Sequence, residues 1–457
     1  MTSLQPAPLT HRAVLKLALP VMISNVSTPL IGVVDTAVVG RLGDPAYIGA
    51  AAIGGLIFTF VFWSFGFLRM GTTGLTAQAL GAADSAELAN CLGRALLAAL
   101  LLGVGLMLLQ WPIRESAFVA IHASQRVEGL ARNYFDIRIW AAPATLANYA
   151  LFGWFVGLGR TGIGLILQII LNLVNMALDV LFVIGCGWEV RGVATGTLIA
   201  EYVAAAIGIA IALRHMRGMG ATWSLRQLLE PGALKRTFGV NRDIMIRTMA
   251  LMAVFVWFAS QGARQGDVIL AANSILLQFI SMSAYFLDGL AFATEALVGQ
   301  AIGAGRRAAL SLSVKMTAAW AAGVALLMSA VLALAGPWFI EFLTVDPAAR
   351  AAANTFLPWA AGAPLLGVWA FQLDGIFIGA THTADMRNAM LASLAIFLGA
   401  CWLLAPFGNH GLWAAFYVQY VARTATLLRY YPRIVRSLPA STSSTAGVRQ
   451  PLRTPQK

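Results

Sequence analysis

The chain has 457 residues, of which 59% are hydrophobic and only 11% are charged. Ordinary soluble domains carry about 25% charged residues, so this composition excludes a soluble enzyme and predicts a membrane protein. The net charge of +12 does not indicate nucleic-acid binding, because the basic residues are scattered between apolar runs and form no patch. The three cysteines are isolated, so neither a disulfide framework nor a metal site is predicted.

Apolar segments long enough to cross about 30 Å of hydrocarbon follow one another along the chain. The first contains Asp35 and lacks a small-residue cleavage site, so it is predicted to be a retained span and not a signal peptide. No segment alternates as barrel strands do, and backbone inside lipid must then be helical. Twelve transmembrane helices are therefore predicted, at about residues 14–39, 46–68, 90–111, 133–157, 163–186, 192–213, 243–262, 268–298, 312–335, 354–378, 388–407 and 410–428.

An internal repeat organises these segments. The run TAQALGA at 76–82 matches VGQAIGA at 298–304, which places Gln78 on Gln300 at an offset of about 222 residues. Further matches at nearly the same offset argue against chance similarity between Ala- and Gly-rich helices. Six helices per copy is an even number, so the copies are related by a pseudo-twofold axis along the membrane normal. The predicted domains are an N-terminal bundle 1–213, a cytoplasmic linker 214–242, a C-terminal bundle 243–430 and a disordered tail 431–457.

The distribution of basic residues predicts the orientation. With both termini inside, cytoplasmic segments carry about three times as many Lys and Arg residues as external ones. We therefore expect a multi-pass protein of a bacterial inner membrane with both termini in the cytoplasm, in contact with membrane lipids.

Acidic residues inside the predicted spans are the strongest functional signal, because an ionisable group in a membrane helix is costly. Basic residues inside the spans are too few to neutralise all of these acids. Some of them should therefore be protonated or should bind a cation. The acids concerned are Asp35, Asp136, Asp179, Glu201, Asp288, Glu295 and Asp374.

Asp35 and Asp179 are expected at similar depths, about 6 and 10 Å from the outer ends of their helices. Asn172, Asn175 and Asp179 share one helical face, and Thr197 lies at a matching depth on the next helix. Loss of water favours the neutral form of a carboxyl group, so this group of residues suits a proton. Its oxygen atoms suit a small hard cation equally well. The simpler alternative is that Asp35 caps its helix or pairs with Arg41, and that Asp179 bonds to a neighbouring helix.

Other residues have weaker assignments. Pro20 is a candidate hinge in the first helix, with a static kink as the alternative. Asp136 and Arg138 are interpreted together as an anchor at the membrane interface, and Asp288, Glu295 and Asp374 as either functional or structural. Candidates for lining a substrate cavity are Phe58, Phe62, Met70, Asn148, Asp288 and Asp374.

Several kinds of chemistry are missing from the sequence. No two of the five histidines have metal-ligand spacing, and there is no phosphate-binding loop of the Walker type. No cofactor, no enzymatic activity and no nucleic-acid partner are expected. Any energy for transport must come from an ion gradient.

Several runs resemble the MATE (multidrug and toxic compound extrusion) family, specifically its DinF branch. They are VVDTAVVG at 33–40 with Pro20 upstream, FLRMGTTGLTAQ at 67–78, NRDIM at 241–245 and LDGIFIGA at 373–380. The resemblance covers about residues 10 to 430. It implies a V-shaped exporter of two six-helix bundles that exchanges protons or sodium ions for cationic or amphipathic organic compounds.

The resemblance also implies roles for single residues. Asp35 matches an aspartate whose protonation is associated with bending at the proline matching Pro20, and Asn175 with Asp179 matches a cation-binding pair. Thr197 fits a hydroxyl position near that pair. The seventh helix lacks the glutamate of the NorM branch, which favours protons over sodium. We therefore expect a monomeric proton-coupled antiporter for small organic molecules, with sodium-coupled efflux or lipid flipping as alternatives.

Overall fold

The structure is a bundle of long helices. A computed structural model describes residues 9–121 and 123–439, and every regular element in these ranges is helical. The first half of the chain forms α1 (His11–Gly40), α2 (Pro45–Trp63), α3 (Phe67–Gly81), α4 (Ser85–Leu108), α5 (Gln110–Ala120), α6 (Gln125–Arg138), η1 (Ile139–Ala141), α7 (Ala142–Gly157), α8 (Thr161–Asp179), η2 (Val180–Gly185) and α9 (Glu189–Gly218). The second forms α10 (Leu225–Leu228), α11 (Pro231–Arg264), α12 (Asp267–Gly303), α13 (Arg307–Leu343), α14 (Pro347–Gly379), α15 (Thr383–Leu403), η3 (Ala405–Phe407) and α16 (Gly408–Arg436).

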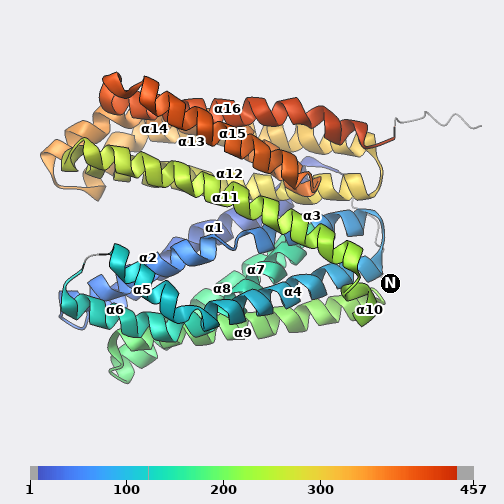
Figure 1. Ribbon diagram of the computed structural model, residues 1–457, viewed down its shortest axis with the longest axis horizontal. Coiled ribbons are helices and arrows are strands. Elements are labelled where there is room, and N and C mark those ends of the chain that lie inside the picture. The colour runs from blue at the N-terminus through green and yellow to red at the C-terminus, as the bar shows by residue number, and fades with distance from the viewer. Residues whose placement is uncertain (1–8, 122, 440–457) are drawn as a thin grey trace, which may run out of the picture.

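The two halves form two layers of helices (Figure 1). Within the described residues, 11 segments are long and apolar enough to span a membrane, which confirms a polytopic helical protein. The segment that falls short is α16, which packs against α14 and α15 as the expected twelfth helix. It carries Gln419 and Arg423 in its middle, so it is more polar than the other spans.

Matching turns repeat the internal duplication in the backbone. Ala83 and Gly305 both have a left-handed backbone conformation, with φ of 56° and 64°. They follow the matching helices α3 and α12. Gly159 and Thr381, with φ of 70° and 54°, follow the matching helices α7 and α14. A left-handed residue just after a helix end is a common way to terminate a helix. Both pairs lie at the offset of the sequence repeat.

The helices extend beyond the predicted spans. α11 begins at Pro231, so the last part of the predicted linker 214–242 is helical, and α10 forms one further turn within it. α16 continues to Arg436, so residues 431–436 of the predicted disordered tail are helical as well. Residues 437–439 of the predicted tail follow without regular structure, and residues 440–457 lie outside the described residues.

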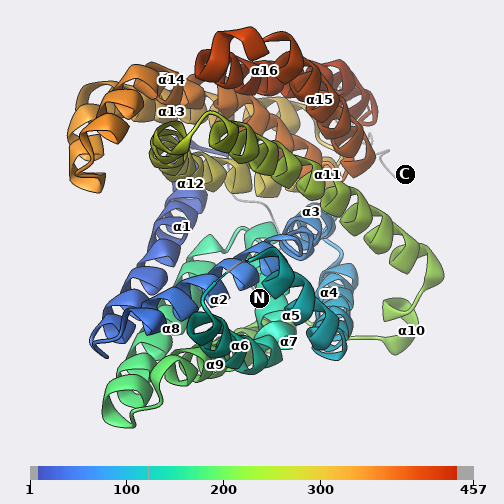
Figure 2. The ribbon, with the colours of Figure 1, turned by 60° about the vertical axis from the view of Figure 1, so that its left-hand side comes forward.

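Helix α1 crosses from one layer to the other (Figure 2). It packs against α12 of the second half and against α8 of the first. Pro20 lies inside the continuous helix and cannot donate a backbone hydrogen bond to Lys16. The Thr161 hydroxyl compensates by donating to the Lys16 carbonyl oxygen at 3.4 Å. At the predicted hinge, Pro20, the backbone hydrogen bond that α1 lacks is therefore replaced by a side-chain hydrogen bond from α8.

Candidate functional site

Asp35 and Asp179 come together in the first half, as the sequence predicts. Their carboxyl groups are within hydrogen-bonding reach of each other, and the charge of Arg138 acts on Asp35. Asp179 is fully buried and is the last residue of α8 before the backbone widens into the π-helical turn η2. Turns of this kind are frequent at functional sites.

The predicted amides and hydroxyl surround this acid pair. Asn175 is fully buried next to Asp179, and its Nδ2 donates to Thr197 Oγ1 at 3.1 Å. Thr197 in turn donates to the Val193 carbonyl oxygen at 2.9 Å. Asn172, one turn earlier on α8, donates to the Ser27 carbonyl oxygen of α1 at 3.4 Å. The amides therefore attach α8 to α9 on one side and to α1 on the other.

Four oxygen atoms of this acid site are buried without a hydrogen-bond donor from the described residues. They are Asp35 Oδ1, Asn175 Oδ1 and both carboxyl oxygens of Asp179. Buried polar atoms are almost always paired, and two carboxylates can share a hydrogen bond only when one of them holds a proton. Two full negative charges within hydrogen-bonding reach of each other in a low-dielectric environment would repel strongly. The arrangement therefore requires a proton or a bound cation.

Gly196 of α9 provides the space for the Asp179 carboxyl group. A Cβ atom at position 196 would lie 2.4 Å from Asp179 Oδ1. If the protein is the proton-coupled antiporter that the resemblance implies, Gly196→Ala should push this carboxyl group away from Asp35 and lower transport driven by a pH gradient by about tenfold or more. Gly162→Ala on α8 is the matched control, because open space surrounds that position. Equal rates for the two variants in proteoliposomes would show that the position of Asp179 is not critical.

A second buried network lies next to the acid site. Arg138 Nη2 donates to Glu201 Oε1 at 3.2 Å, and Asn148 Nδ2 donates to Glu201 Oε2 at 2.8 Å. The Arg138 guanidinium also lies over the rings of Phe58 and Phe62, 5.6 and 5.4 Å from their centres. Asn148, predicted to line a cavity, is therefore bound to a buried ion pair.

The expected anchor formed by Asp136 and Arg138 is wrong. Asp136 accepts from Arg114 Nη1 at 2.9 Å near the surface, whereas Arg138 is buried with Glu201. The reason is helical geometry, since residues two positions apart point to different sides of a helix. The spacing of two positions therefore turns Asp136 and Arg138 to different sides of α6, and they do not form one anchor.

The acids of the second half are mostly neutralised by arginines. Asp374 of α14 forms ion pairs with Arg247 of α11 and Arg423 of α16, and all three are buried. Glu295 of α12 pairs with Arg69 of α3 at 3.6 Å. The negative charge of Asp374, a predicted cavity residue, is therefore balanced by two arginines.

Asp288 is the exception among the acids of the second half. It is half-buried on α12, and the structure gives it neither an ion pair nor a hydrogen bond within the described ranges. Met70, another predicted cavity residue, is half-buried, and its sulfur lies 3.9 Å from Arg247 Nη1. Phe58 and Phe62 pack in the core of the first half, 4% and 5% exposed. Any role of these residues in binding substrate stays a prediction.

Sequence reasoning missed several residues of the site. Arg247 and Arg423 were given no role, although a buried arginine in a span needs an acidic partner, which was the available signal. Tyr134, buried and close to the charges of Asp35 and Asp179, and Gly196 gave no signal in a single sequence.

Comparisons with known proteins agree with this architecture. The sequence model of the MatE family matches residues 20–181 and 244–403, one match in each half of the chain. The chain belongs to the MatE family. Its relatives are transporters and not enzymes, so this MatE protein is a membrane transporter.

Two relatives show how far the similarity extends. DNA damage-inducible protein F of Escherichia coli K12 is 40% identical over 93% of this chain and 92% of its own. The probable multidrug resistance protein NorM of Deinococcus radiodurans is 30% identical over 90% of this chain and 94% of its own.

Solved structures share the fold. A MATE crystal structure described as the bent conformation has a TM-score of 0.85 at 20% identity, covering 93% of this chain and 96% of that one. A MOP superfamily transporter from Pyrococcus furiosus has a TM-score of 0.83 at 20% identity with the same coverage. At this identity the likeness shows the MatE fold alone.

Proposed function

We propose that this MatE protein is a proton-coupled antiporter that exports cationic or amphipathic organic compounds across a bacterial inner membrane, with both termini in the cytoplasm. Its bacterial relatives named NorM are described as probable multidrug resistance proteins. The observation that carries the proposal is the acid pair of the half-buried Asp35 and the fully buried Asp179, in which Asp35 Oδ1 and both Asp179 oxygens are buried without a donor from the described residues.

The charge balance of the spans supports a coupling role for this pair. Four other span acids each have an arginine within 4 Å, namely Asp136, Glu201, Glu295 and Asp374. The acids that remain are Asp35, Asp179 and Asp288. Of these, only Asp35 and Asp179 are close enough together to share a proton. The two span acids of the first half that lack an arginine within 4 Å therefore lie together, so that a transported proton can bind between them.

A proton fits this site better than a sodium ion. Asn175 Nδ2 and Thr197 Oγ1 already bond to each other, and Thr197 also donates to the backbone. Sodium would have to be held mainly by the remaining oxygen atoms of Asp35, Asn175 and Asp179. One proton between two carboxyl groups removes their repulsion and supplies the missing donor at once.

The mechanism follows from the elements that the pair connects. Asp35 lies on α1, which also packs along α12 of the other half, and Asp179 lies on α8. A proton shared by the pair holds α1 to α8, and loss of the proton replaces attraction by repulsion. Because α1 contacts both halves, this change alters the relative stability of two arrangements of the halves. Coupling requires that proton and substrate bind these arrangements with different affinity.

Asp288 is the residue that we propose for attracting a cationic substrate, because it forms no ion pair within the described ranges, although the charges of Arg69 and Arg247 act on it from farther away. Lipid flipping is less well supported. An anionic headgroup needs free cations, whereas the half-buried Arg69 and the buried Arg138, Arg247 and Arg423 are all paired with acids. We propose that the monomer is the transporting unit.

Proteoliposomes test this function directly. A pH gradient and a sodium gradient are imposed separately, and export of cationic, neutral and anionic fluorescent amphiphiles is measured. We expect the pH gradient to drive export of the cationic dyes and the sodium gradient at constant pH to have no effect. Acceleration by sodium alone, or transport of anionic amphiphiles only, would contradict the proposal.

A further inference from the structure

Two matching glutamines join the halves of the molecule at one end. Gln78 Nε2 on α3 donates to the carbonyl oxygen of Gly379 at 2.9 Å and to Thr381 Oγ1 at 3.2 Å. Gln300 Nε2 on α12 donates to the carbonyl oxygen of Gly157 at 3.3 Å. Gln78 matches Gln300 in the repeat, and Gly157 matches Gly379. Gln78 of the first half therefore binds the end of α14 in the second half, and Gln300 of the second half binds the matching end of α7 in the first half.

Two matching glycines bring the same helices into backbone contact. A Cβ atom on Gly81 would lie 2.1 Å from the carbonyl oxygen of Gln300. A Cβ atom on Gly303 would lie 2.0 Å from the carbonyl oxygen of Gln78. Side chains cannot come this close to backbone, so α3 and α12 can touch in this way only because both positions are glycine. We refer to Gln78, Gly81, Gln300 and Gly303 as the glutamine clasp.

Polar contacts between the halves lie, among the described residues, between this end of the molecule and the middle of the long helices. Besides the clasp, they include Asn25 Nδ2 with the Tyr285 carbonyl oxygen, Arg69 with Glu295, and Trp320 Nε1 with His11 Nδ1. At the opposite end, the described parts of α5, η2 and the start of α9 form no hydrogen bond to the second half. Among the described residues, the halves are therefore joined by hydrogen bonds at the clasp, whereas α5, η2 and the start of α9 at the far end form none to the second half.

We propose that the glutamine clasp is one of the two gates of the transport cycle, and that Gln78 and Gln300 must release their partners before substrate can enter from that side. With both termini inside, this is the cytoplasmic side, and the structure is then the outward-facing state. The inference rests on the proposed transport function. It adds residues that act through the position of the two halves and do not touch the coupling proton.

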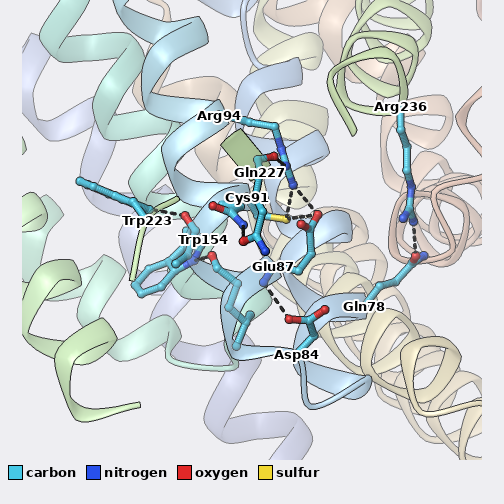
Figure 3. Close-up of polar contacts among 12 residues, drawn as sticks. Gln78, Asp84, Glu87, Cys91, Arg94, Trp154, Trp223, Gln227 and Arg236 are labelled. Carbon is cyan, nitrogen blue, oxygen red and sulfur yellow. Dashed lines mark hydrogen bonds and ion pairs between the residues drawn. The ribbon is translucent and has the colours of Figure 1, made fainter. Parts of the chain in front are cut away.

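The clasp is not fully symmetrical. Arg236 Nη2, near the start of α11, donates to Gln78 Oε1 at 2.7 Å (Figure 3). The segment before α11 is bound to α4, where Trp223 Nε1 donates to the Ala89 carbonyl oxygen and Gln227 accepts from Asn90. A hydrogen bond from a charged donor is about twice as strong as a neutral one. The linker therefore orients Gln78, and the Gln78 side of the clasp should contribute more than the Gln300 side.

Distance measurements across the clasp test the inference. Spin labels are placed by Ala82→Cys and Arg306→Cys, in a background in which Cys91, Cys186 and Cys401 are replaced, and the protein is studied in lipid nanodiscs by pulsed electron paramagnetic resonance. We expect each of Gln78→Ala and Gln300→Ala to raise the ratio of long to short distances about threefold to tenfold, since each removes interactions between the halves. Gln78→Ala should have the larger effect, and the double variant the largest.

The control is Gln372→Ala, which removes a buried glutamine bonded to Thr294 and Thr317 within the second half only. An unchanged distance distribution in the clasp variants, or an equal shift in the control, would overturn the inference. Gln300→Asn replaces the alanine variant if that variant does not fold, because the shorter amide keeps its polarity but does not reach Gly157. The measurement needs neither substrate nor ion gradient, so its result is independent of whether the proposed proton coupling holds.

Discussion

Asp35→Asn is expected to abolish export driven by a pH gradient while the protein still folds. The asparagine has nearly the same size and can donate a hydrogen bond from its amide to Asp179. It therefore resembles the protonated aspartate permanently, and the buried oxygens of Asp179 gain a donor that they lack in the described structure. Because the site can no longer change its charge, we expect rates in proteoliposomes to fall to those of protein-free vesicles. Exchange of labelled for unlabelled substrate across the membrane should persist, since it needs no net proton movement.

Asp136→Asn is the matched control, because Asp136 is also a span acid but pairs with Arg114 near the surface. Such pairs contribute about 0–1 kcal/mol, so stability and transport should change little. Asp179→Asn should be as inactive as Asp35→Asn, and the double variant no worse than either, because the two residues act as a unit. Undiminished pH-driven export by Asp35→Asn would refute its coupling role.

Asp374→Asn is expected to destabilise the protein more than loss of either arginine bound to it. The substitution leaves Arg247 and Arg423 buried beside each other without a counter-charge. Removal of one partner of a buried pair costs about 3–5 kcal/mol. Arg423→Met, in contrast, leaves Asp374 paired with Arg247 and removes the repulsion between two like charges, so its cost should be clearly smaller.

Thermal unfolding of the purified variants in detergent measures this order. Combining Asp374→Asn with Arg423→Met should recover part of the stability lost by Asp374→Asn alone. If Arg423→Met were the more harmful change, the cluster would not be held by Asp374. The result also bears on function, since a residue required to balance two arginines is poorly suited to bind a cationic substrate.

The fold could be predicted because lipid imposes a simple rule. Apolar segments must be helices, and matching residues such as Gln78 and Gln300 reveal the duplication without any structure. Helix ends were less predictable. α11 begins at Pro231 and α16 ends at Arg436, in stretches rich in charge, because helices continue beyond the hydrocarbon where hydropathy gives no signal.

The acid site could be predicted only in part. Depth along a helix follows from residue number, which is why Asp35 and Asp179 were expected to meet. The direction in which a side chain points toward other helices does not follow from one sequence. That is why the pairing of Arg138 with Glu201 was missed and a pairing with Asp136 was expected instead.

Release of protons on substrate binding tests the central claim most directly. Purified protein in weakly buffered detergent is mixed with a saturating cationic dye such as ethidium, and the pH change is read with an indicator. If Asp35 and Asp179 hold a proton that substrate displaces, the wild-type protein should release about one proton per bound dye. Asp35→Asn, which resembles the protonated form, should bind dye more weakly and release none even when it is saturated. Dye binding without proton release by the wild type, or equal release by the variant, would contradict the account.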